Sequence, residues 1–282
     1  MDKKNYQIGL YEKAMPPGLS WEEKLQIAKA VGYDFLELSI DETDEKLHRL
    51  KISWAERFAL LKAMYDTQIP IRTMCLSGHR KYPLGSEDPR IRSRSLEIME
   101  DAVNLADALG IRIIQLAGYD EYYGESNERT KALFYEGLVH AVEMASAKGV
   151  ILAFETMETE FMNTVHKVMD YVLRINSPYL QVYPDCGNIT NAAKTYGTDV
   201  LADLRSGAGH IAAVHLKETL PGKFREIPYG TGHVNFEACI ETALNLKVRL
   251  FVTEFWYTRE TDLTRTIQIS KDFIDRKFSS LP

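Results

Sequence analysis

The chain has 282 residues, of which 45% are hydrophobic and 26% are charged, and its formal net charge is −6. This composition is ordinary for a soluble globular protein, and the acidic balance without a long basic run excludes a typical nucleic-acid partner. No apolar stretch approaches the roughly 18 residues of a membrane span, so we expect no membrane partner.

The first residues contain no apolar run of the kind that a signal peptide needs. The three cysteines, Cys75, Cys186 and Cys239, are far apart, which favours neither a disulfide framework nor a zinc knuckle. Both features predict a cytoplasmic protein. The sequon Asn188-Ile189-Thr190 is therefore expected to carry no glycan.

Short apolar runs alternate with longer amphipathic stretches along the chain. In chain order, we predict strands at residues 7–10, 34–39, 70–75, 111–116, 150–155, 180–185, 210–215 and 250–254. The predicted helices lie at residues 20–32, 54–65, 90–109, 128–148, 162–175, 200–205, 236–246 and 263–278. Pro184 and Gly187 are interpreted as a turn that ends the sixth strand.

This alternation of eight strands and eight helices predicts a parallel sheet with right-handed crossovers. No linker rich in Pro, Gly or Ser divides the chain, so residues 1–282 are interpreted as a single α/β domain, a (β/α)8 TIM barrel. A doubly wound open sheet is the alternative. Long loops follow the third and seventh strands, and long loops in compact domains are often functional.

Four consecutive strands end in metal-ligand side chains. They are Glu155, Asp185, His215 and Glu254. In a TIM barrel the active site lies at the carboxyl ends of the strands, so these groups converge if the alternating side chains of their faces point inward.

Three carboxylates and one imidazole that lie together repel and desolvate one another, and a divalent cation relieves that cost. The oxygen-rich set suits Zn²⁺, Mn²⁺, Co²⁺ or Mg²⁺ without choosing among them. Four protein ligands on a six-coordinate ion leave two positions for a bidentate substrate. The sequence therefore predicts one divalent metal ion at the barrel mouth.

Several motifs carry a resemblance to a known family. They are "GLYEKAMP" (9–16), "DFLELSIDETDEKLHRL" (34–50), "MCLSGHRKYPLGSED" (74–88), "IQLAGYD" (114–120), "YPDCGN" (183–188), "GHIAAVHLKET" (209–219) and "VNFEACIE" (234–241). On these residues the chain resembles the xylose isomerase-like TIM-barrel superfamily. Among its ketose 3-epimerases, it is most similar to the bacterial L-xylulose-5-phosphate (L-ribulose-5-phosphate) 3-epimerases of ascorbate and related pentose pathways.

The resemblance implies a metal held by Glu155, Asp185, His215 and Glu254, with Glu155 and Glu254 as the acid/base pair. It implies that L-xylulose 5-phosphate and L-ribulose 5-phosphate interconvert through a metal-stabilised cis-enediolate. The free-ketohexose epimerases typically place a histidine three residues after the metal Asp, where this chain has Asn188. That departure favours a phosphorylated pentulose as the substrate.

Candidate substrate contacts lie near these strand ends. Phosphate donors are expected among Lys217, Arg225, His79 and their basic neighbours Lys223 and Arg80. Glu158 and Asn188 are expected to bind sugar hydroxyls.

Other residues keep two interpretations. Glu37 ends the second strand and either lines the pocket or pairs with a basic neighbour. Trp256 is a candidate pocket wall, and Tyr122 and Tyr123 either cover the pocket or pack at an oligomer contact. His210 is expected at the far rim. The sequence leaves a homodimer open.

Three alternative functions remain. An aldose–ketose isomerase, or a free-ketose 3-epimerase, of the same superfamily would use overlapping site residues. A phosphodiesterase resembling the apurinic endonucleases would need more histidines at strand ends than His215 alone. A non-catalytic sugar-phosphate binding protein would not need two suitably placed glutamates.

Overall fold

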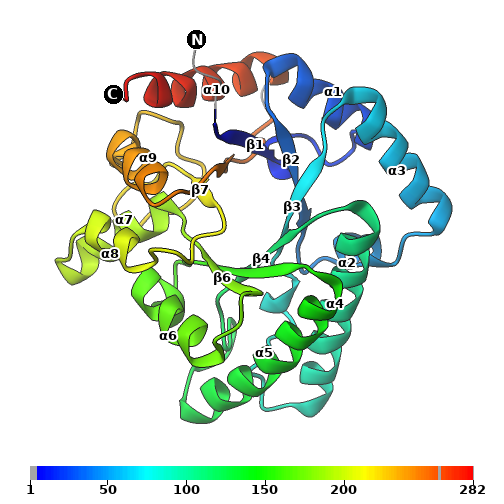
Figure 1. Cartoon of the computed structure of the whole chain (residues 1–282), viewed down its shortest axis with the longest axis vertical. Helices are drawn as coiled ribbons and strands as arrows, with labels where there is room; N and C mark the ends of the chain where they lie inside the picture. Colours follow the sequence, from blue (N-terminus) through cyan, green and yellow to red (C-terminus); the bar gives the residue numbers. More distant parts are fainter. Residues whose placement is uncertain (1–4, 260–261, 282) are drawn as a thin grey trace.

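The computed structural model describes residues 5–259 and 262–281. Its centre is a parallel barrel surrounded by helices (Figure 1). The strands are β1 (Gln7–Tyr11), β2 (Phe35–Ile40), β3 (Ile71–Leu76), β4 (Ile113–Ala117), β5 (Ile151–Glu155), β6 (Leu180–Tyr183), β7 (Val214–Leu216) and β8 (Leu250–Thr253).

The described helices follow the strands in turn. The α-helices are α1 (Trp21–Val31), α2 (Asp44–His48), α3 (Trp54–Thr67), α4 (Pro89–Leu109), α5 (Glu128–Lys148), α6 (Val165–Ile175), α7 (Cys186–Tyr196), α8 (Val200–Ser206), α9 (Phe236–Asn245) and α10 (Leu263–Ser279). Short 3-10 turns are η1 (Glu12–Ala14), η2 (Arg49–Lys51), η3 (Gly78–Arg80) and η4 (Glu160–Met162).

The sheet runs in the order β6-β5-β4-β3-β2-β1-β8-β7, and each paired strand is parallel to its neighbour. Isolated bridges between Val182 and Ile211 and between Asp185 and His215 join the two ends of this sheet. The (β/α)8 barrel expected from the sequence is therefore confirmed, and its last seam holds two of the predicted metal ligands.

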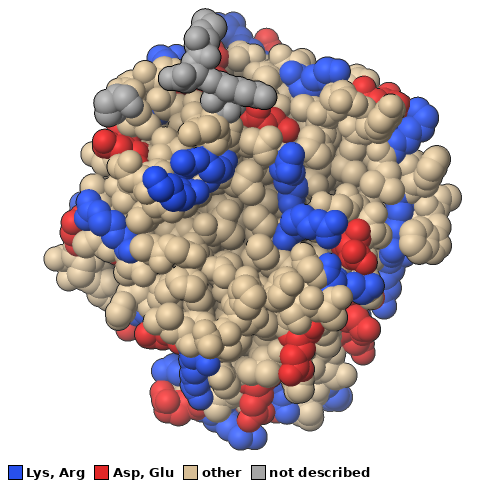
Figure 2. Space-filling model, viewed as in Figure 1, with Lys and Arg blue, Asp and Glu red and all other residues tan. Residues whose placement is uncertain are grey.

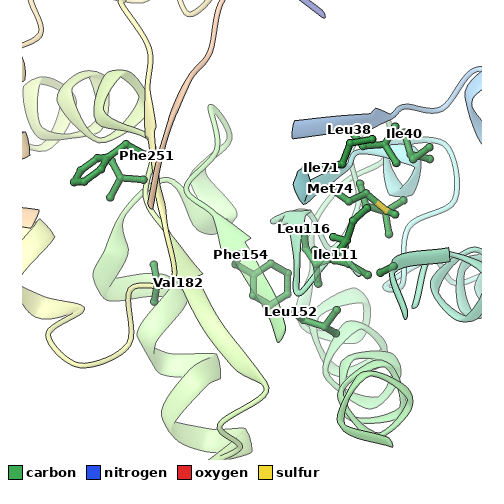
Figure 3. Close-up of a cluster of buried hydrophobic side chains, with 14 of the residues drawn as sticks. Leu38, Ile40, Ile71, Met74, Ile111, Leu116, Leu152, Phe154, Val182 and Phe251 are labelled. Carbon is green, nitrogen blue, oxygen red and sulfur yellow. The ribbon is translucent and has the colours of Figure 1, made fainter. Parts of the chain in front are cut away.

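The barrel wall has an inner and an outer apolar layer. Inside, the cluster includes Phe35, Ala153, Ala213 and Val252, which share strand faces with the polar residues at the strand ends. Outside, strand residues such as Leu38 and Phe154 pack against the helices (Figure 3). This alternation points the polar strand ends into the barrel mouth.

Gly9 makes room for the inner layer. A Cβ atom at Gly9 would lie 2.3 Å from the Phe35 ring, which fills the barrel interior from the neighbouring strand. Glycine is therefore required here by close packing, since its backbone does not adopt a left-handed conformation.

Helix ends follow the expected capping chemistry. Ser20 accepts a hydrogen bond from the backbone N–H of Glu23, whose side chain returns a bond to Ser20, so the predicted capping box is present. Gly110 and Gly149 end α4 and α5 in the left-handed conformation.

Two helices were not predicted. The segment read as a turn after the sixth strand is the start of α7, and a short α2 follows β2. The seventh strand, expected at 210–215, is confined to Val214–Leu216. The turn prediction failed because Gly187 and Asn188, which usually favour turns, sit in the first turn of α7 behind the cap Asp185.

Charges of both signs are interspersed on the face shown in Figure 2, without a continuous basic surface. Among the described helices, none combines the length and the apolar character that crossing a membrane requires.

Candidate metal centre and active site

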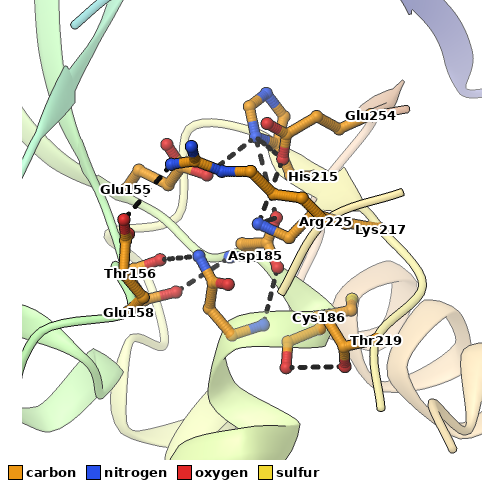
Figure 4. Close-up of polar contacts among 12 residues, drawn as sticks. Glu155, Thr156, Glu158, Asp185, Cys186, His215, Lys217, Thr219, Arg225 and Glu254 are labelled. Carbon is orange, nitrogen blue, oxygen red and sulfur yellow. Dashed lines mark hydrogen bonds and ion pairs between the residues drawn. The ribbon is translucent and has the colours of Figure 1, made fainter. Parts of the chain in front are cut away.

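The four residues predicted as metal ligands meet in space. One potential ligand atom from each of Glu155, Asp185, His215 and Glu254 lies within 4.8 Å of the others, and all four residues are buried. Figure 4 shows the carboxylates converging on the His215 ring from separate segments of the chain. The convergence predicted from the strand ends is therefore present in the structure.

His215 is oriented by a carboxylate behind it. Its Nε2 lies 2.7 Å from Oε1 of Glu37, while its Nδ1 lies 3.2 Å from Glu155 and 3.2 Å from Glu254. Glu37 also accepts hydrogen bonds from Thr73 and Tyr183. A proton on Nε2 bound to Glu37 leaves the Nδ1 lone pair facing the other carboxylates, as a metal-binding histidine requires.

The charge around His215 favours a cation. Burial lowers the pKa of His215, but Glu37 and Glu254 outweigh that effect and leave the pKa well above its ordinary value. A divalent ion competes with a proton for the same lone pair. The negative charges that stabilise a proton on the His215 ring would therefore also stabilise a metal ion bound to it.

The first turn of α7 positions the Asp185 carboxylate. Its Oδ1 accepts the backbone N–H of Asn188 at 2.7 Å as the helix cap, and its own N–H donates to the Thr156 hydroxyl at 2.9 Å. A Cβ atom at Gly187 would lie 2.5 Å from a Thr219 methyl group. The first turn of α7 therefore packs tightly enough to fix the carboxylate.

Two buried oxygens of the cluster, Oδ2 of Asp185 and Oε2 of Glu254, accept no hydrogen bond among the described residues. Nζ of Lys217 lies 3.0 Å from the first and 3.4 Å from the second, within ion-pair range. Buried carboxylate oxygens without directed hydrogen bonds are costly unless a cation neutralises them. These residues therefore fit a divalent metal ion.

The two glutamates have opposite electrostatic environments. Burial raises the pKa of Glu155, and the charge of Glu254 raises it further. Burial also acts to raise the pKa of Glu254, but Lys217 and His215 outweigh it and hold that pKa well below its usual value. Two carboxyl groups displaced in opposite directions are suited to act as acid and base.

A small cavity opens beside this cluster. Glu155 and Glu254 lie in its wall with Lys217, and an aromatic side is formed by Tyr11 and Trp256. The rings of Trp256 and Tyr11 pack edge to face, with centroids 6.2 Å apart. Trp256 thus stands where the sequence predicted a pocket wall.

Three predicted substrate contacts line the cavity. Arg225 and Glu158 form an ion pair at 3.2 Å, and Tyr119 donates a hydrogen bond to Glu158. Asn188 donates to the Thr156 carbonyl at 2.7 Å, and its own carbonyl oxygen accepts no hydrogen bond among the described residues. The sequence therefore located this side of the cavity.

The predicted phosphate contacts are less well placed. The structure does not bring His79 to the cavity: the ring is buried, its Nε2 lies 3.2 Å from the Ser95 carbonyl of α4, and burial lowers its pKa to about 4. Lys217 does reach the cavity, but its ammonium group is paired with the carboxylates of Asp185 and Glu254. Lys223 is exposed and is not among the cavity residues.

Two other cations line the cavity. Arg80 stacks near the rings of Tyr119 and Tyr122, and its Nε has no hydrogen-bond partner among the described residues. Lys13, just after β1, pairs with Asp41 at 2.6 Å. Sequence reasoning missed Lys13, although its position directly after the first strand marks the same barrel end.

The contacts of the remaining candidates place them in the structure. Tyr122 contributes a hydrogen bond at 3.5 Å to Glu158, whereas Tyr123 is exposed and bonds to Glu42. His210 contacts Gln181 and not the candidate metal ligands, as expected from its predicted position at the far rim.

Comparison with known proteins gives the family. A family model described as xylose isomerase-like TIM barrel matches residues 25–276. The chain belongs to this family.

A curated relative is similar to this chain over almost its whole length. The L-ribulose-5-phosphate 3-epimerase UlaE of Escherichia coli O139:H28 is 43% identical over 280 residues, covering 99% of this chain and 97% of the relative. The resemblance to these epimerases expected from the sequence motifs is therefore confirmed.

Solved structures agree on the fold. A structure of L-ribulose 3-epimerase superposes with a TM-score of 0.77 at 18% identity, covering 98% of this chain and 95% of the other. The 3-keto-D-glucoside 4-epimerase YcjR from E. coli gives a TM-score of 0.78 at 15% identity, covering 96% and 99%. At these identities, the likeness supports the barrel alone.

Proposed function

We propose that this protein is a metal-dependent 3-epimerase that interconverts L-xylulose 5-phosphate and L-ribulose 5-phosphate. The observation that carries the proposal is the pair Glu155 and Glu254, both at the cavity and both 3.2 Å from Nδ1 of His215. The near full-length similarity to L-ribulose-5-phosphate 3-epimerases supports the substrate class.

Epimerisation at C3 requires removal of a proton next to the C2 carbonyl and its return from the opposite face. In the barrel, β5 and β8 are separated by β6 and β7, so Glu155 and Glu254 approach the cavity from different sides. In our proposal one glutamate takes the C3 proton, and the other gives a proton to the planar enediolate. The direction of the reaction decides which acts first.

Glu155, Asp185, His215 and Glu254 would hold one divalent cation. When bound, that ion polarises the substrate carbonyl and stabilises the negative charge that develops on the oxygens. The chain's own contribution is orientation: Glu37 fixes His215, and the cap of α7 fixes Asp185. Gln115 donates to Oε2 of Glu155 at 2.5 Å, which restrains the carboxylate.

The substrate phosphate is assigned in this proposal to the cationic wall of the cavity. Lys13, Arg80 and Arg225 line it, and the buried Nε of Arg80 lacks a hydrogen-bond partner among the described residues. Charge-assisted hydrogen bonds from arginine suit a phosphate dianion. Glu158 and Asn188 then face the sugar hydroxyls.

We also place the reaction in the cytoplasm, in the catabolism of ascorbate and related pentoses. The three cysteines are free and buried, which suits a reducing compartment.

Product analysis distinguishes this proposal from an aldose–ketose isomerase. The purified protein is incubated with L-ribulose 5-phosphate, L-xylulose 5-phosphate and their unphosphorylated forms, and the products are followed by NMR. The proposal expects a new ketose phosphate and little turnover of the free sugars. An aldose product would contradict it, as would equal turnover of the free and phosphorylated ketoses.

A further inference from the structure

The β7–α9 loop, residues 217–235, forms part of the cavity wall although it contains no helix or strand. It brings Phe224 and Arg225 to the cavity. Arg225 extends across the site toward Glu158 (Figure 4), and its guanidinium lies 5.8 Å from the centroid of the Trp256 ring. A loop of this length is ordinarily mobile, so contacts elsewhere must hold Arg225 in this position.

Glu218 joins the two ends of this loop. Its side chain is buried, and its Oε1 accepts hydrogen bonds from the backbone N–H groups of Thr219 and Val234, both at 3.2 Å. Its Oε2 accepts the backbone N–H of Gly230 at 3.0 Å. Hydrogen bonds to an ionised acceptor are roughly twice as strong as neutral ones. One carboxylate therefore holds the residues just after β7 against the residues just before α9.

The base of the loop is closely packed around Glu218. The N–H of His233 donates to the Thr219 carbonyl at 3.0 Å, and the Thr219 hydroxyl lies 3.0 Å from Nε2 of His233. A Cβ atom at Gly232 would lie 2.3 Å from Oε1 of Glu218 and 2.2 Å from the Thr219 carbonyl oxygen. The backbone of the loop therefore lies directly against the carboxylate.

A second contact holds the tip of the loop. The backbone groups of Leu220 and Lys223 exchange hydrogen bonds of 3.0 and 2.8 Å around a Pro-Gly turn, in which Gly222 has a φ of 71°. The N–H of Gly222 donates to Oδ1 of Asn191 on α7 at 3.0 Å. Arg225 follows this turn directly, so it lies between two fixed points of the loop.

Glu218 itself does not line the cavity. Any effect that it has on the substrate is therefore exerted through the residues that the loop presents. Among these, Arg225 carries a positive charge and five N–H donors, so its ion pair with Glu158 leaves donors for a phosphate. A donor that is held in place before the substrate arrives loses less entropy on binding.

We propose that Glu218 is a positioning residue for substrate recognition and acts through Arg225. The proposal rests on the proposed function, in which Arg225 belongs to the cationic wall that binds the substrate phosphate. Glu218 and Asn191 fix the loop at its base and its tip, which directs Arg225 into the cavity before substrate binds. Loss of Glu218 should raise KM for the phosphorylated ketose and leave kcat, which depends on the chemistry at C3, nearly unchanged.

Steady-state kinetics test this assignment. Glu218→Gln replaces one acceptor oxygen by an NH₂ group, so at least one hydrogen bond from the loop is lost. We expect KM for the phosphorylated pentulose to rise roughly 5–10-fold, the effect of leaving one side chain to be ordered on binding, with kcat within about 2-fold. Glu226→Gln, which removes an exposed carboxylate of the same loop, is the matched control and should leave KM unchanged.

A double variant tests the route through Arg225. Once Arg225→Met has removed the guanidinium, adding Glu218→Gln should change KM by less than about 2-fold, because residues that act through one another are not additive. Asn191→Leu releases the tip without altering charge and should raise KM as Glu218→Gln does. Additive effects of Glu218→Gln and Arg225→Met, or equal losses with free and phosphorylated ketoses in Glu218→Gln, would overturn the proposal.

Hydrogen–deuterium exchange examines the loop without substrate. In Glu218→Gln, residues 219–234 should exchange at least about 10-fold faster while β7 and β8 exchange as in the wild type, which separates release of the loop from loss of the fold. A protein that epimerises no ketose phosphate would contradict the proposed function. Unchanged exchange of the loop in a protein that does epimerise it would contradict the role of Glu218 alone.

Discussion

Nε2 of His215 and Oε1 of Glu37 lie 2.7 Å apart although 178 positions separate them in the chain. This contact fixes the ring so that Nδ1 faces the three carboxylates of the candidate metal centre. Glu37 is thus a positioning residue that acts through His215, since its own oxygens are occupied by His215, Thr73 and Tyr183.

Replacing Glu37 should weaken the metal site while leaving the barrel folded. We expect Glu37→Gln to lower metal affinity roughly 10–100-fold. An uncharged amide holds the imidazole of His215 less firmly than the carboxylate does, and the substitution removes the negative charge of Glu37. Competition with a chromophoric chelator measures the affinity. Glu22→Gln on the exposed face of α1 is the control. Equal metal affinities in the Glu37 variant and the wild type would show that Glu37 does not support metal binding through His215.

Metal binding should stabilise the fold as well as support turnover. At a free metal concentration 100 times the dissociation constant, mass action predicts about 2.7 kcal/mol of added stability. We expect chelation to lower the melting temperature and to stop turnover, with both restored by one equivalent of a suitable divalent ion. In Asp185→Asn, the melting temperature should respond little to the metal. A full response in that variant would contradict the ligand assignment.

A third prediction concerns the phosphate end of the cavity. Removing one charge-assisted hydrogen bond costs about 1.5–3 kcal/mol, so Arg80→Met and Lys13→Met should each raise KM for the phosphorylated pentulose roughly 10–100-fold. The effect on any residual turnover of the free pentulose should be small. Arg90→Met, an exposed site at the start of α4, is the control. Equal losses with free and phosphorylated sugars would place the phosphate elsewhere.

Acid should destabilise the protein through Glu12. This buried carboxylate contacts Lys24, Lys46 and Arg49 at 2.7–2.9 Å. Burial acts to raise the pKa of Glu12, but Lys46, Lys24 and Arg49 outweigh it and lower the pKa to about 2 from 4.5. A depressed folded-state pKa contributes stability that is complete above pH 4.5 and is lost as the pH falls toward 2.

Urea denaturation checks this sign. Glu12→Gln should lose about 3–5 kcal/mol at pH 7, because three cations then lack their buried partner. The difference from wild type should shrink as the pH falls from about 5 to 3. Glu56→Gln, which removes the exposed capping-box carboxylate of α3, should cost less than about 1 kcal/mol. A Glu12 effect that does not vary with pH would refute the electrostatic explanation.

Much of the fold was readable from local patterns. Apolar runs predicted the strands, and Gly110 and Gly149 predicted helix ends, because these signals depend only on residues that are close in sequence. The four candidate metal ligands could be proposed from the sequence because each ends a predicted strand. Helix α7 was missed because its first residues resemble a turn, and tertiary packing at Gly187 overrides that preference.

The rest of the site depends on contacts that no local pattern carries. The partnership of Glu37 with His215 joins β2 to β7, and the sequence left the role of Glu37 undecided. His79 and Arg80 are adjacent in the chain and both lie in η3, but their side chains point in different directions. The His79 ring contacts α4, whereas the Arg80 side chain lines the cavity. Side-chain direction in a loop is set by packing and could not be predicted.

The most direct test of the central claim is the formation of C3-deuterated L-xylulose 5-phosphate from L-ribulose 5-phosphate in deuterated water, followed by NMR in the wild type, Glu155→Gln and Glu254→Gln. We predict metal-dependent formation of this epimer by the wild type, and a loss in each variant of at least about 100-fold with the fold retained, because one face of C3 loses its proton carrier. Wild-type formation of the epimer by either variant, or a metal-loaded wild type that does not form it, would contradict the account.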